Sequence, residues 1–513
     1  MQQVSDQYGY VVDAVYADRF YKELSPVWLN YVATLHGAAP RSLDTPFSYL
    51  ELGSGFANSV LVNAAAYPHG QFVACDINPD HIAEAQARAE RFGIDNLTLH
   101  QASFADLLAQ PSLPQFDFIV LHGVYSWVAG EVRNTVRQII ASRLKPGGLV
   151  YISYNCKPGW SPEEPLRKLL VELSVTEAGN SAQRARAALQ SLNQLSSKLS
   201  YFKQHPSAIT GLNAYANEPD NYLAHEFLNQ SWQTYYSVDI AEEMSHIGLT
   251  FVGSATLVDN HPFLLVDEAS YEAINQLGND RQKQLAFDFA CNKRFRRDVF
   301  INGTVERGGS VLDNMAQLPF VSTKDPEYIV DIITTPRGKI SFNKSFIAEL
   351  RTLMSQGPIS FKQALVQMGG NGRNETEIFR NIVFLIAAGE LQICLHTESH
   401  AADGAEQQRI RSTIGNMLDF IIERGSAFPL PSQMLGNGYS LEPVEAMAIK
   451  SWLEGAHERE RLIPVIQQYL HRRHPHTAMS QDALDKQAVR IAKQVLNVVI
   501  PRLQALAIIG CRI

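Results

Sequence analysis

Several features that define whole classes of protein are missing from this 513-residue sequence. The five cysteines form no C-x-x-C pair and stand far apart, at Cys75, Cys156, Cys291, Cys394 and Cys511, so neither a disulfide framework nor a cysteine-bound zinc is indicated. No run of 18 apolar residues occurs, and the first residues lack the basic and apolar segments of a secretory signal. We therefore expect a cytoplasmic protein without membrane insertion.

Positive charge is also in deficit. Lys and Arg number 44 against 52 Asp and Glu, which gives a net charge of −8. Proteins that bind nucleic acid usually present a basic field to the phosphates, so no nucleic-acid partner is expected. Three histidines crowd together at His471, His474 and His476, but no carboxylate or cysteine stands at ligand spacing, which favours a solvated loop over a metal site.

The first third of the chain carries the pattern of a parallel sheet covered by helices. Between residues 47 and 154 the apolar runs FSYLEL, QFVACDI, NLTLHQ, FDFIVLHG and GGLVYISYN alternate with amphipathic stretches. Asn78 as cap, Pro79 at the first position and Gly93 as stop delimit one crossover helix. An inserted helical stretch follows, and LTFVGSATL and FRRDVFI then resume the sheet. In a returning edge strand, FRRD at 295–298 would form surface salt bridges.

The remaining chain is mainly helical in pattern. Gly and polar residues over 304–317 indicate a linker, after which GPISFKQALVQM and ETEIFRNIVFLIAAGELQICLH read as two helices followed by a strand. Ile378, Ile382, Leu385 and Ile386 share one helix face, which supports a small winged-helix-like unit near 340–400. Residues 405–513 read as helices with one break, at AFPLPSQMLGNG.

The stretch YLELGSGFANS, residues 49–59, has the features of a cofactor turn. A strand ends at Leu52 and a helix starts near Ala57, so the glycine turn between them would point backbone N–H groups at a ligand. Asp76, which ends the next strand, can accept hydrogen bonds from ribose hydroxyls. The dinucleotide pattern G-x-G-x-x-G is incomplete because its last position is Asn58. Glu51 would repel a pyrophosphate but attract a cationic ligand, which favours the methyl donor S-adenosylmethionine over a hydride carrier.

These motifs, together with ACDINPDHIAEA, FDFIVLHGVYSWV and LKPGGLVYISYNCKPGW, resemble those of the class I S-adenosylmethionine-dependent methyltransferases. YLAHEFLNQSW at 222–232 and NKRFRRDVFING at 292–303 are similar to the bacterial group that carries a methyltransferase regulatory domain, which includes the rickettsial protein lysine methyltransferases. The resemblance covers about residues 45–400. It is specific for cofactor and fold, and less specific for the methyl acceptor.

The resemblance implies a set of cofactor-binding residues. Gly53, Gly55 and His122 would line the methionine part, Glu51 its amino end and Asp76 the ribose, while Ile77, Ser103 and Phe104 would contact the adenine. Ala57 replaces a glycine common in the family's turn, and Ser103 replaces a frequent aspartate. Purely structural roles are the alternative: Glu51 and Asp76 could cap helices or pair with basic side chains, and His122 could be an ordinary structural histidine.

Methyl transfer is an in-line displacement, so the site must mainly align the groups and exclude water. The loops after the fourth and fifth strands supply the predicted catalytic residues Tyr125, Trp127, Tyr154 and Asn155 at the sheet edge where such folds bind ligands. Trp127 and Trp160 could instead be packing anchors. One of the N-terminal tyrosines Tyr8, Tyr10, Tyr16 and Tyr21 could close the site.

We therefore predict an α/β protein built on a Rossmann-like class I methyltransferase sheet. The predicted parts are an N-terminal helical cap (1–46), the cofactor-binding core (47–160), a helical insertion (161–235), the end of the sheet with the regulatory region (236–303), a linker (304–325), a winged-helix-like domain (326–400) and a helical C-terminal domain (401–513). Protein lysine is the acceptor that the resemblance favours. A small-molecule or glycan-precursor methyltransferase and a non-catalytic cofactor-binding protein are the alternatives, and a homodimer is left open.

Overall fold

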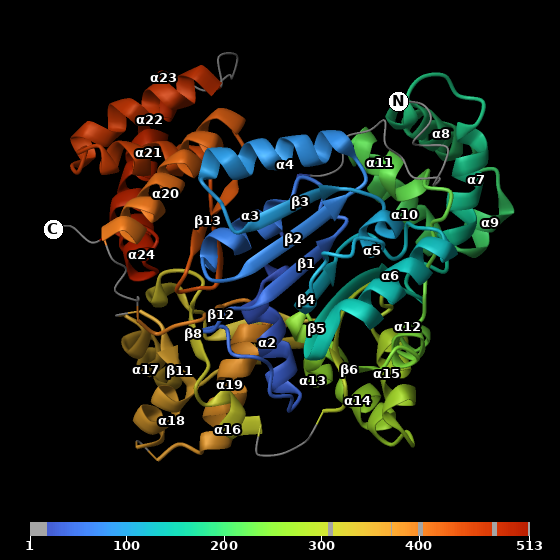
Figure 1. Ribbon diagram of the computed structural model, residues 1–513, viewed down its shortest axis with the longest axis horizontal. Helices are drawn as coiled ribbons and strands as arrows, with labels where there is room; N and C mark the ends of the chain where they lie inside the picture. Colours follow the sequence, from blue (N-terminus) through green and yellow to red (C-terminus); the bar gives the residue numbers. More distant parts are fainter. Residues whose placement is uncertain are drawn as a thin grey trace.

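A seven-stranded sheet forms the centre of the computed structural model, which describes residues 18–305, 311–355, 357–370, 372–398, 404–473 and 480–510 (Figure 1). The strand order is β3-β2-β1-β4-β5-β7-β6. The strands are β1 (Ser48–Leu52), β2 (Gln71–Asp76), β3 (Leu97–Gln101), β4 (Phe116–Leu121), β5 (Leu144–Asn155), β6 (Leu249–Ser254) and β7 (Phe295–Asn302). Strands β1 to β5 pair in parallel, whereas β7 runs antiparallel to both β5 and β6. All seven predicted strands are confirmed.

β1 and β4 are buried along their whole length, because helices cover both faces of the sheet. The crossover helices are α3 (Asn58–Ala66), α4 (Pro79–Phe92), α5 (Phe104–Leu108) and α6 (Gly130–Arg143). Helix α4 begins and ends where its sequence signals predict. The Asn78 side chain accepts a hydrogen bond from the Asp80 N–H, and Gly93 ends the helix in the left-handed region at φ 69°.

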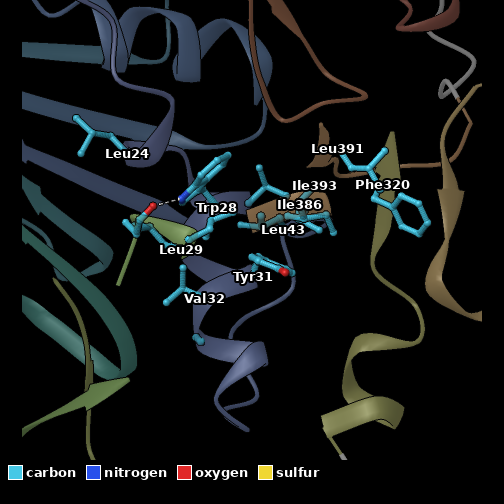
Figure 2. Packing of buried hydrophobic residues seen from close by; sticks show 14 of the residues in the cluster. Leu24, Trp28, Leu29, Tyr31, Val32, Leu43, Phe320, Ile386, Leu391 and Ile393 are labelled. Atoms are coloured by element: carbon cyan, nitrogen blue, oxygen red, sulfur yellow. Dashed lines mark hydrogen bonds between the residues drawn. The ribbon is translucent and has the colours of Figure 1, made fainter. Parts of the chain in front are cut away.

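The described part of the N-terminal region packs beneath the sheet. It contains η1 (Lys22–Leu24) and α2 (Pro26–Leu35), and nine of the ten α2 residues are buried. Figure 2 shows α2 between the sheet and the later segments that carry Phe320 and Leu391, which belong to the same apolar cluster. On the side of the sheet, Trp28 donates its Nε1–H to the Ala255 carbonyl at 2.8 Å. A helix that is apolar all round is stable only when it is covered on all sides, as α2 is.

The predicted insertion is built mainly of helices. Its helices are α7 (Glu164–Ser174), α8 (Ser181–Ser196), α9 (Ser200–Gln204), α10 (Pro206–Tyr215) and α11 (Asp220–Phe227). They pack around their own apolar cluster. The chain leaves the sheet and returns at neighbouring positions, because Cys156 and Tyr235 form a parallel bridge and the Lys157 N–H donates to the Tyr235 carbonyl at 2.8 Å.

The returning segment corrects one expectation about FRRD. It contains α12 (Ser237–Ser245), η2 (Leu257–Asn260), α13 (Pro262–Leu265), α14 (Glu268–Asn275) and α15 (Asp280–Ala290), with β6 and β7. Because β7 lies between β5 and β6, it is no edge strand. Arg296 and Asp298 are 3% and 1% exposed, and Arg296 pairs with both Asp288 and Asp298. These residues thus form a buried ion-pair network rather than surface salt bridges.

The C-terminal third begins within the predicted linker. Residues 311–322 form α16 (Val311–Met315) and β8 (Pro319–Ser322), and β8 is the central strand of a sheet with β11 (Ile359–Ser360) and β12 (Leu391–Ile393), so the linker prediction is corrected there. The predicted pair of helices with a following strand is confirmed as α18 (Phe361–Gly369), α19 (Glu375–Ala387) and β12. The unit also contains η3 (Pro326–Tyr328), the hairpin β9 (Ile332–Thr335) and β10 (Gly338–Ser341), and α17 (Lys344–Met354).

The last domain, termed here the C-terminal domain (residues 404–510), is mainly helical as predicted. It contains α20 (Gly404–Arg424), α21 (Pro443–Leu453), α22 (Arg459–Arg473), α23 (Gln481–Gln494), the π-helical η4 (Val495–Val499) and α24 (Ile500–Ala505). The predicted break at AFPLPSQMLGNG is a β-hairpin of β13 (Phe428–Ser432) and β14 (Asn437–Leu441). Figure 1 shows this domain, in orange and red, on the opposite side of the sheet from the insertion.

Candidate active site

The glycine turn after β1 adopts the geometry that its sequence predicts. The Gly53 and Ser54 N–H groups donate to the Cys75 carbonyl at 2.9 and 3.1 Å, which ties the turn to β2. Gly53 has φ 71°, and a Cβ there would lie 2.5 Å from Val124 Cγ2. Gly55 has φ 53°, in the left-handed region that favours glycine, and no atom lies within 4 Å of the position that a Cβ would take. Glycine therefore allows a ligand to approach the backbone closely here.

A single cavity lies over this turn at the carboxyl ends of the parallel strands, where folds of this kind bind ligands. All eight predicted cofactor residues line it: Glu51, Gly53, Gly55, Asp76, Ile77, Ser103, Phe104 and His122. Trp127, which was predicted as catalytic, also lines the cavity. The structure therefore brings together residues from four different strand ends that the sequence separates by more than seventy positions.

Glu51 is the most unusual group in this cavity. It is 5% exposed, and its Oε2 has no hydrogen-bond partner among the residues that the structure describes. Burial, with a smaller contribution from the negative charge of Asp76, raises the pKa of Glu51 to about 8. A buried carboxylate that lacks a cation partner costs free energy, and a cationic ligand group in the cavity that Glu51 lines would offset this cost.

Asp76 is held in place by the backbone around it. Its Oδ2 accepts the Gly55 N–H at 2.8 Å, and its Oδ1 accepts the Asn78 N–H at 2.9 Å. His81 Nδ1 lies 3.3 Å from the same Oδ1. A carboxylate has about four lone-pair positions, so these contacts orient Asp76 while leaving capacity for ligand hydroxyls.

Ser103 and His122 each already contact another side chain of the protein. The Ser103 hydroxyl accepts the Asp106 N–H at 3.1 Å and donates to Asp106 Oδ2 at 2.6 Å, so it caps α5. His122 Nδ1 lies 2.7 Å from the Tyr151 hydroxyl. Burial, and secondarily the positive charge of Arg297, lowers the pKa of His122 to about 3, so its imidazole is neutral at physiological pH.

The N-terminal segment supplies cavity residues that sequence reasoning only partly foresaw. Tyr21 lines the cavity and its ring lies 3.8 Å from the ring of His122, centroid to centroid. Asp18 and Arg19 line the cavity as well, although no local pattern marks them. The other tyrosines named as candidates, Tyr8, Tyr10 and Tyr16, lie outside the described residues.

Three predicted catalytic residues do not line the cavity, which corrects their assignment. Tyr125 is fully buried, and its hydroxyl contacts Glu243 and accepts a hydrogen bond from Arg137 at 3.0 Å. Tyr154 is equally buried and donates its O–H to Asp298 at 2.5 Å. Both hydroxyls are bonded within the protein, and burial raises the pKa of each well above its usual value.

Asn155 joins the sheet to the insertion instead of facing the cavity. Its N–H donates to Ser126 Oγ at 2.8 Å, and its Nδ2 donates to Glu226 Oε1 at 3.2 Å. Trp160, considered as a packing anchor, is 3% exposed and stacks edge-on against Trp232 at 5.0 Å between ring centroids. These residues therefore anchor the insertion.

Other kinds of site are not found in the described ranges. Within them, no group of three or more His, Cys, Asp or Glu side chains is arranged to hold a metal ion. His474 and His476 of the predicted solvated loop lie outside those ranges. No helix of the described chain has the length and apolar character needed to cross a bilayer.

Comparison with known proteins identifies two regions by family. Residues 50–150 match the family model described as a methyltransferase domain, and residues 219–302 match the one described as a predicted methyltransferase regulatory domain. The uncharacterized protein sll1526 of Synechocystis is 29% identical over 448 residues, which cover 86% of this chain and 87% of that protein. The uncharacterized protein RP789 of Rickettsia prowazekii is 27% identical over 56% of this chain and 51% of its own length.

A solved structure matches nearly the whole chain. PKMT2 from Rickettsia typhi, in complex with AdoHcy, has a TM-score of 0.67 and 19% sequence identity, and the match covers 96% of this chain and 99% of that one. This likeness establishes the fold, including the arrangement of the domains outside the sheet. The chain therefore contains a methyltransferase domain and a predicted methyltransferase regulatory domain, on a fold that is similar over nearly its whole length to that of PKMT2.

Proposed function

We propose that the cavity holds S-adenosylmethionine, with Glu51 at the amino end of its methionine part. This carboxyl carries the proposal, because a buried Glu51 oxygen without a partner suits an ammonium group and opposes a pyrophosphate. His122, whose pKa is lowered to about 3, stays neutral and so does not repel the cationic sulfonium. When bound, S-adenosylmethionine supplies an activated methyl group.

The remaining lining residues fit the other parts of this ligand. Asp76, oriented by the Gly55 N–H, would accept hydrogen bonds from the ribose hydroxyls. Ile77 and Phe104 would cover the adenine with apolar surface, while the Ser103 hydroxyl is already used as a helix cap. Trp127 offers an aromatic face in the same cavity.

The acceptor that we favour is a protein lysine. The overall likeness to PKMT2 and the large helical insertion beside the carboxyl ends of β4 and β5 support it: the Gln233 N–H donates to the Ser126 carbonyl at 2.8 Å, which fixes the insertion beside the loop after β4. A lysine amine has a reference pKa of about 10.4, so holding it neutral near pH 7.4 costs about 4 kcal/mol. The site must therefore desolvate the amine or pass its proton to water.

The test is transfer of tritiated methyl groups from S-adenosylmethionine into a cell lysate that is then separated into protein and small-molecule fractions. Label in protein that is released as methyl-lysine on hydrolysis, and lost with Asp76→Ala, is the expected result. Label confined to small molecules would replace protein lysine with a metabolic acceptor. Binding of S-adenosylmethionine without transfer to any fraction would indicate a cofactor-binding regulatory protein.

A further inference from the structure

Residues 18–25, termed the strap, run along the cofactor cavity at Asp18–Tyr21 and then form η1 (Lys22–Leu24). Tyr21 has φ −121° and ψ 102°, so successive side chains point to opposite sides. Asp18, Arg19 and Tyr21 line the cavity. Phe20 packs in the apolar cluster of the C-terminal domain instead. The strap therefore borders the cavity and contacts the C-terminal domain at the same time.

The C-terminal domain forms polar contacts with the strap at both of its ends. At its start, Arg424 at the end of α20 lies 2.8 Å from Asp18 Oδ2 with Nη1 and donates from Nη2 to the Asp18 carbonyl at 3.0 Å. Arg88 of α4 pairs with the same carboxylate at 3.1 Å. Burial alone would raise the pKa of Asp18, but Arg88 and Arg424 outweigh it and hold that pKa below its usual value.

At the other end, a single buried amide fixes the strap. Asn437, the first residue of β14, is 6% exposed and donates from Nδ2 to the Lys22 carbonyl at 3.1 Å and to Ser25 Oγ at 2.9 Å. Its Oδ1 accepts the Gly438 N–H at 2.8 Å, which sets the orientation of the amide. Asn437 is thus a positioning residue that never touches the cavity.

Between these two clamps, Tyr21 is fixed in place over the cavity. Its N–H donates to Ser59 Oγ at 3.0 Å, and its ring lies against His122, at the end of the cavity that holds Glu51 and His122. No hydrogen bond links Asn437 or Arg424 to a cavity wall other than the strap itself within the described ranges. The strap is therefore the hydrogen-bonded connection between these two residues and the cavity, although the hairpin β13–β14 also packs against α3, whose first residues Asn58 and Ser59 line the cavity.

We propose that the C-terminal domain completes the cofactor site indirectly: Asn437 and Arg424 hold the strap, and the strap holds Tyr21 against the bound S-adenosylmethionine. This inference rests on the proposed assignment of the cavity to that cofactor. Coupling of this kind is reciprocal, so the bound cofactor must in turn stabilise the contact between strap and hairpin β13–β14.

The test is the dissociation rate of tritiated S-adenosylmethionine from the preloaded full-length protein after a chase with unlabelled ligand. Asn437→Ala and Arg424→Gln should each release the ligand about tenfold faster, equal to about 1.4 kcal/mol. Two matched controls should keep the parent rate. Ser440→Ala alters an exposed residue of the same hairpin, and Arg91→Gln removes the Arg91–Glu423 ion pair, which joins α4 to α20 without touching the strap.

A purely structural role predicts a different set of results. Parent rates in folded Asn437→Ala and Arg424→Gln would overturn the proposal, and so would equally fast release from Arg91→Gln, since domain docking in general would then be responsible. If Asn437→Ala does not fold, Arg424→Gln at the other end of the strap gives the same test. Amide hydrogen exchange supplies an independent readout, because ligand should slow exchange in β13 and β14 of the parent protein and not of Asn437→Ala.

The outcomes also separate this inference from the proposed function. A parent protein that binds no S-adenosylmethionine would refute the assignment of the cavity. Binding that is weakened by Asp76→Ala but unaffected by both strap variants would leave the assignment in place and overturn the role of the C-terminal domain.

Discussion

Replacing Glu51 with glutamine should stabilise the cofactor-free protein increasingly as the pH rises. The carboxyl is 5% exposed, and its pKa rises from 4.5 to about 8 on folding because of burial and, to a lesser extent, the charge of Asp76. Below pH 4.5 both the folded and the unfolded chain hold the proton, so Glu51 does not affect the free energy of unfolding. Between pH 4.5 and 8 only the unfolded chain loses the proton, which disfavours folding by about 1.36 kcal/mol per pH unit.

This difference is large enough to measure. At pH 7 the interval between the reference pKa of 4.5 and the pH of the solution corresponds to about 3 kcal/mol. Glutamine is neutral at every pH, so this cost does not arise in Glu51→Gln. The difference in free energy of unfolding between the variant and the parent should therefore be near zero at pH 4.5 and grow up to about pH 8. Urea unfolding of both cofactor-free proteins at several pH values measures the gap. Glu90→Gln, at an exposed position on α4, is the control and should show no such growth.

Binding provides the second half of the same prediction. At pH 7 Glu51 must release its proton to pair with an ammonium group, so S-adenosylmethionine binding should release close to one proton and strengthen as the pH rises toward 8. Calorimetry in buffers of different ionisation enthalpy measures this release. A stability gap independent of pH, or binding without proton release, would show that Glu51 is already ionised in the empty cavity and would refute the reasoning.

The remaining predictions concern single groups of the core. Asp76→Ala should weaken S-adenosylmethionine binding by about 1.5–3 kcal/mol, as expected for hydrogen bonds to a charged group, and unchanged binding in calorimetry would remove Asp76 from the site. Ala57, at φ 58° and ψ 23°, occupies the left-handed region, so Ala57→Gly should raise the free energy of unfolding by about 0.5–1 kcal/mol; a loss of stability would contradict this. Tyr125→Phe should leave the methyl-transfer rate unchanged and cost about 1 kcal/mol of stability through its lost contacts with Glu243 and Arg137, whereas slowed transfer in a fully stable protein would return Tyr125 to the site.

The sequence was sufficient for the sheet and for the residues that gather around the cavity over the glycine turn because both depend on short-range signals. Apolar runs marked all seven strands, and Glu51, Gly53 and Asp76 stand at strand ends, whose positions follow once the strands are known. The hairpin β13–β14 escaped prediction because Pro429 and Pro431 look like breakers. In the structure they fall at alternate positions of a two-stranded hairpin, where proline is tolerated.

The surroundings of the predicted catalytic side chains could not be predicted in the same way. Tyr125 and Tyr154 also follow strand ends, but their side chains turn into the interior, and nothing local reveals which way an aromatic residue in a loop will point. Their partners, Glu243 and Asp298, lie more than a hundred residues away in the sequence. The contacts of Asn437 with the strap span more than four hundred residues, a separation at which no single-sequence pattern carries information.

The two ends of the helical insertion are adjacent, which makes the insertion an exchangeable module. Its two ends meet at the bridge between Cys156 and Tyr235, so a short connection between these two residues could replace the whole insertion without moving the strands. Segments with adjacent ends can be lengthened, shortened or replaced at small cost to the host domain. Exchange of this one segment would therefore leave the strand ends that line the cavity in place.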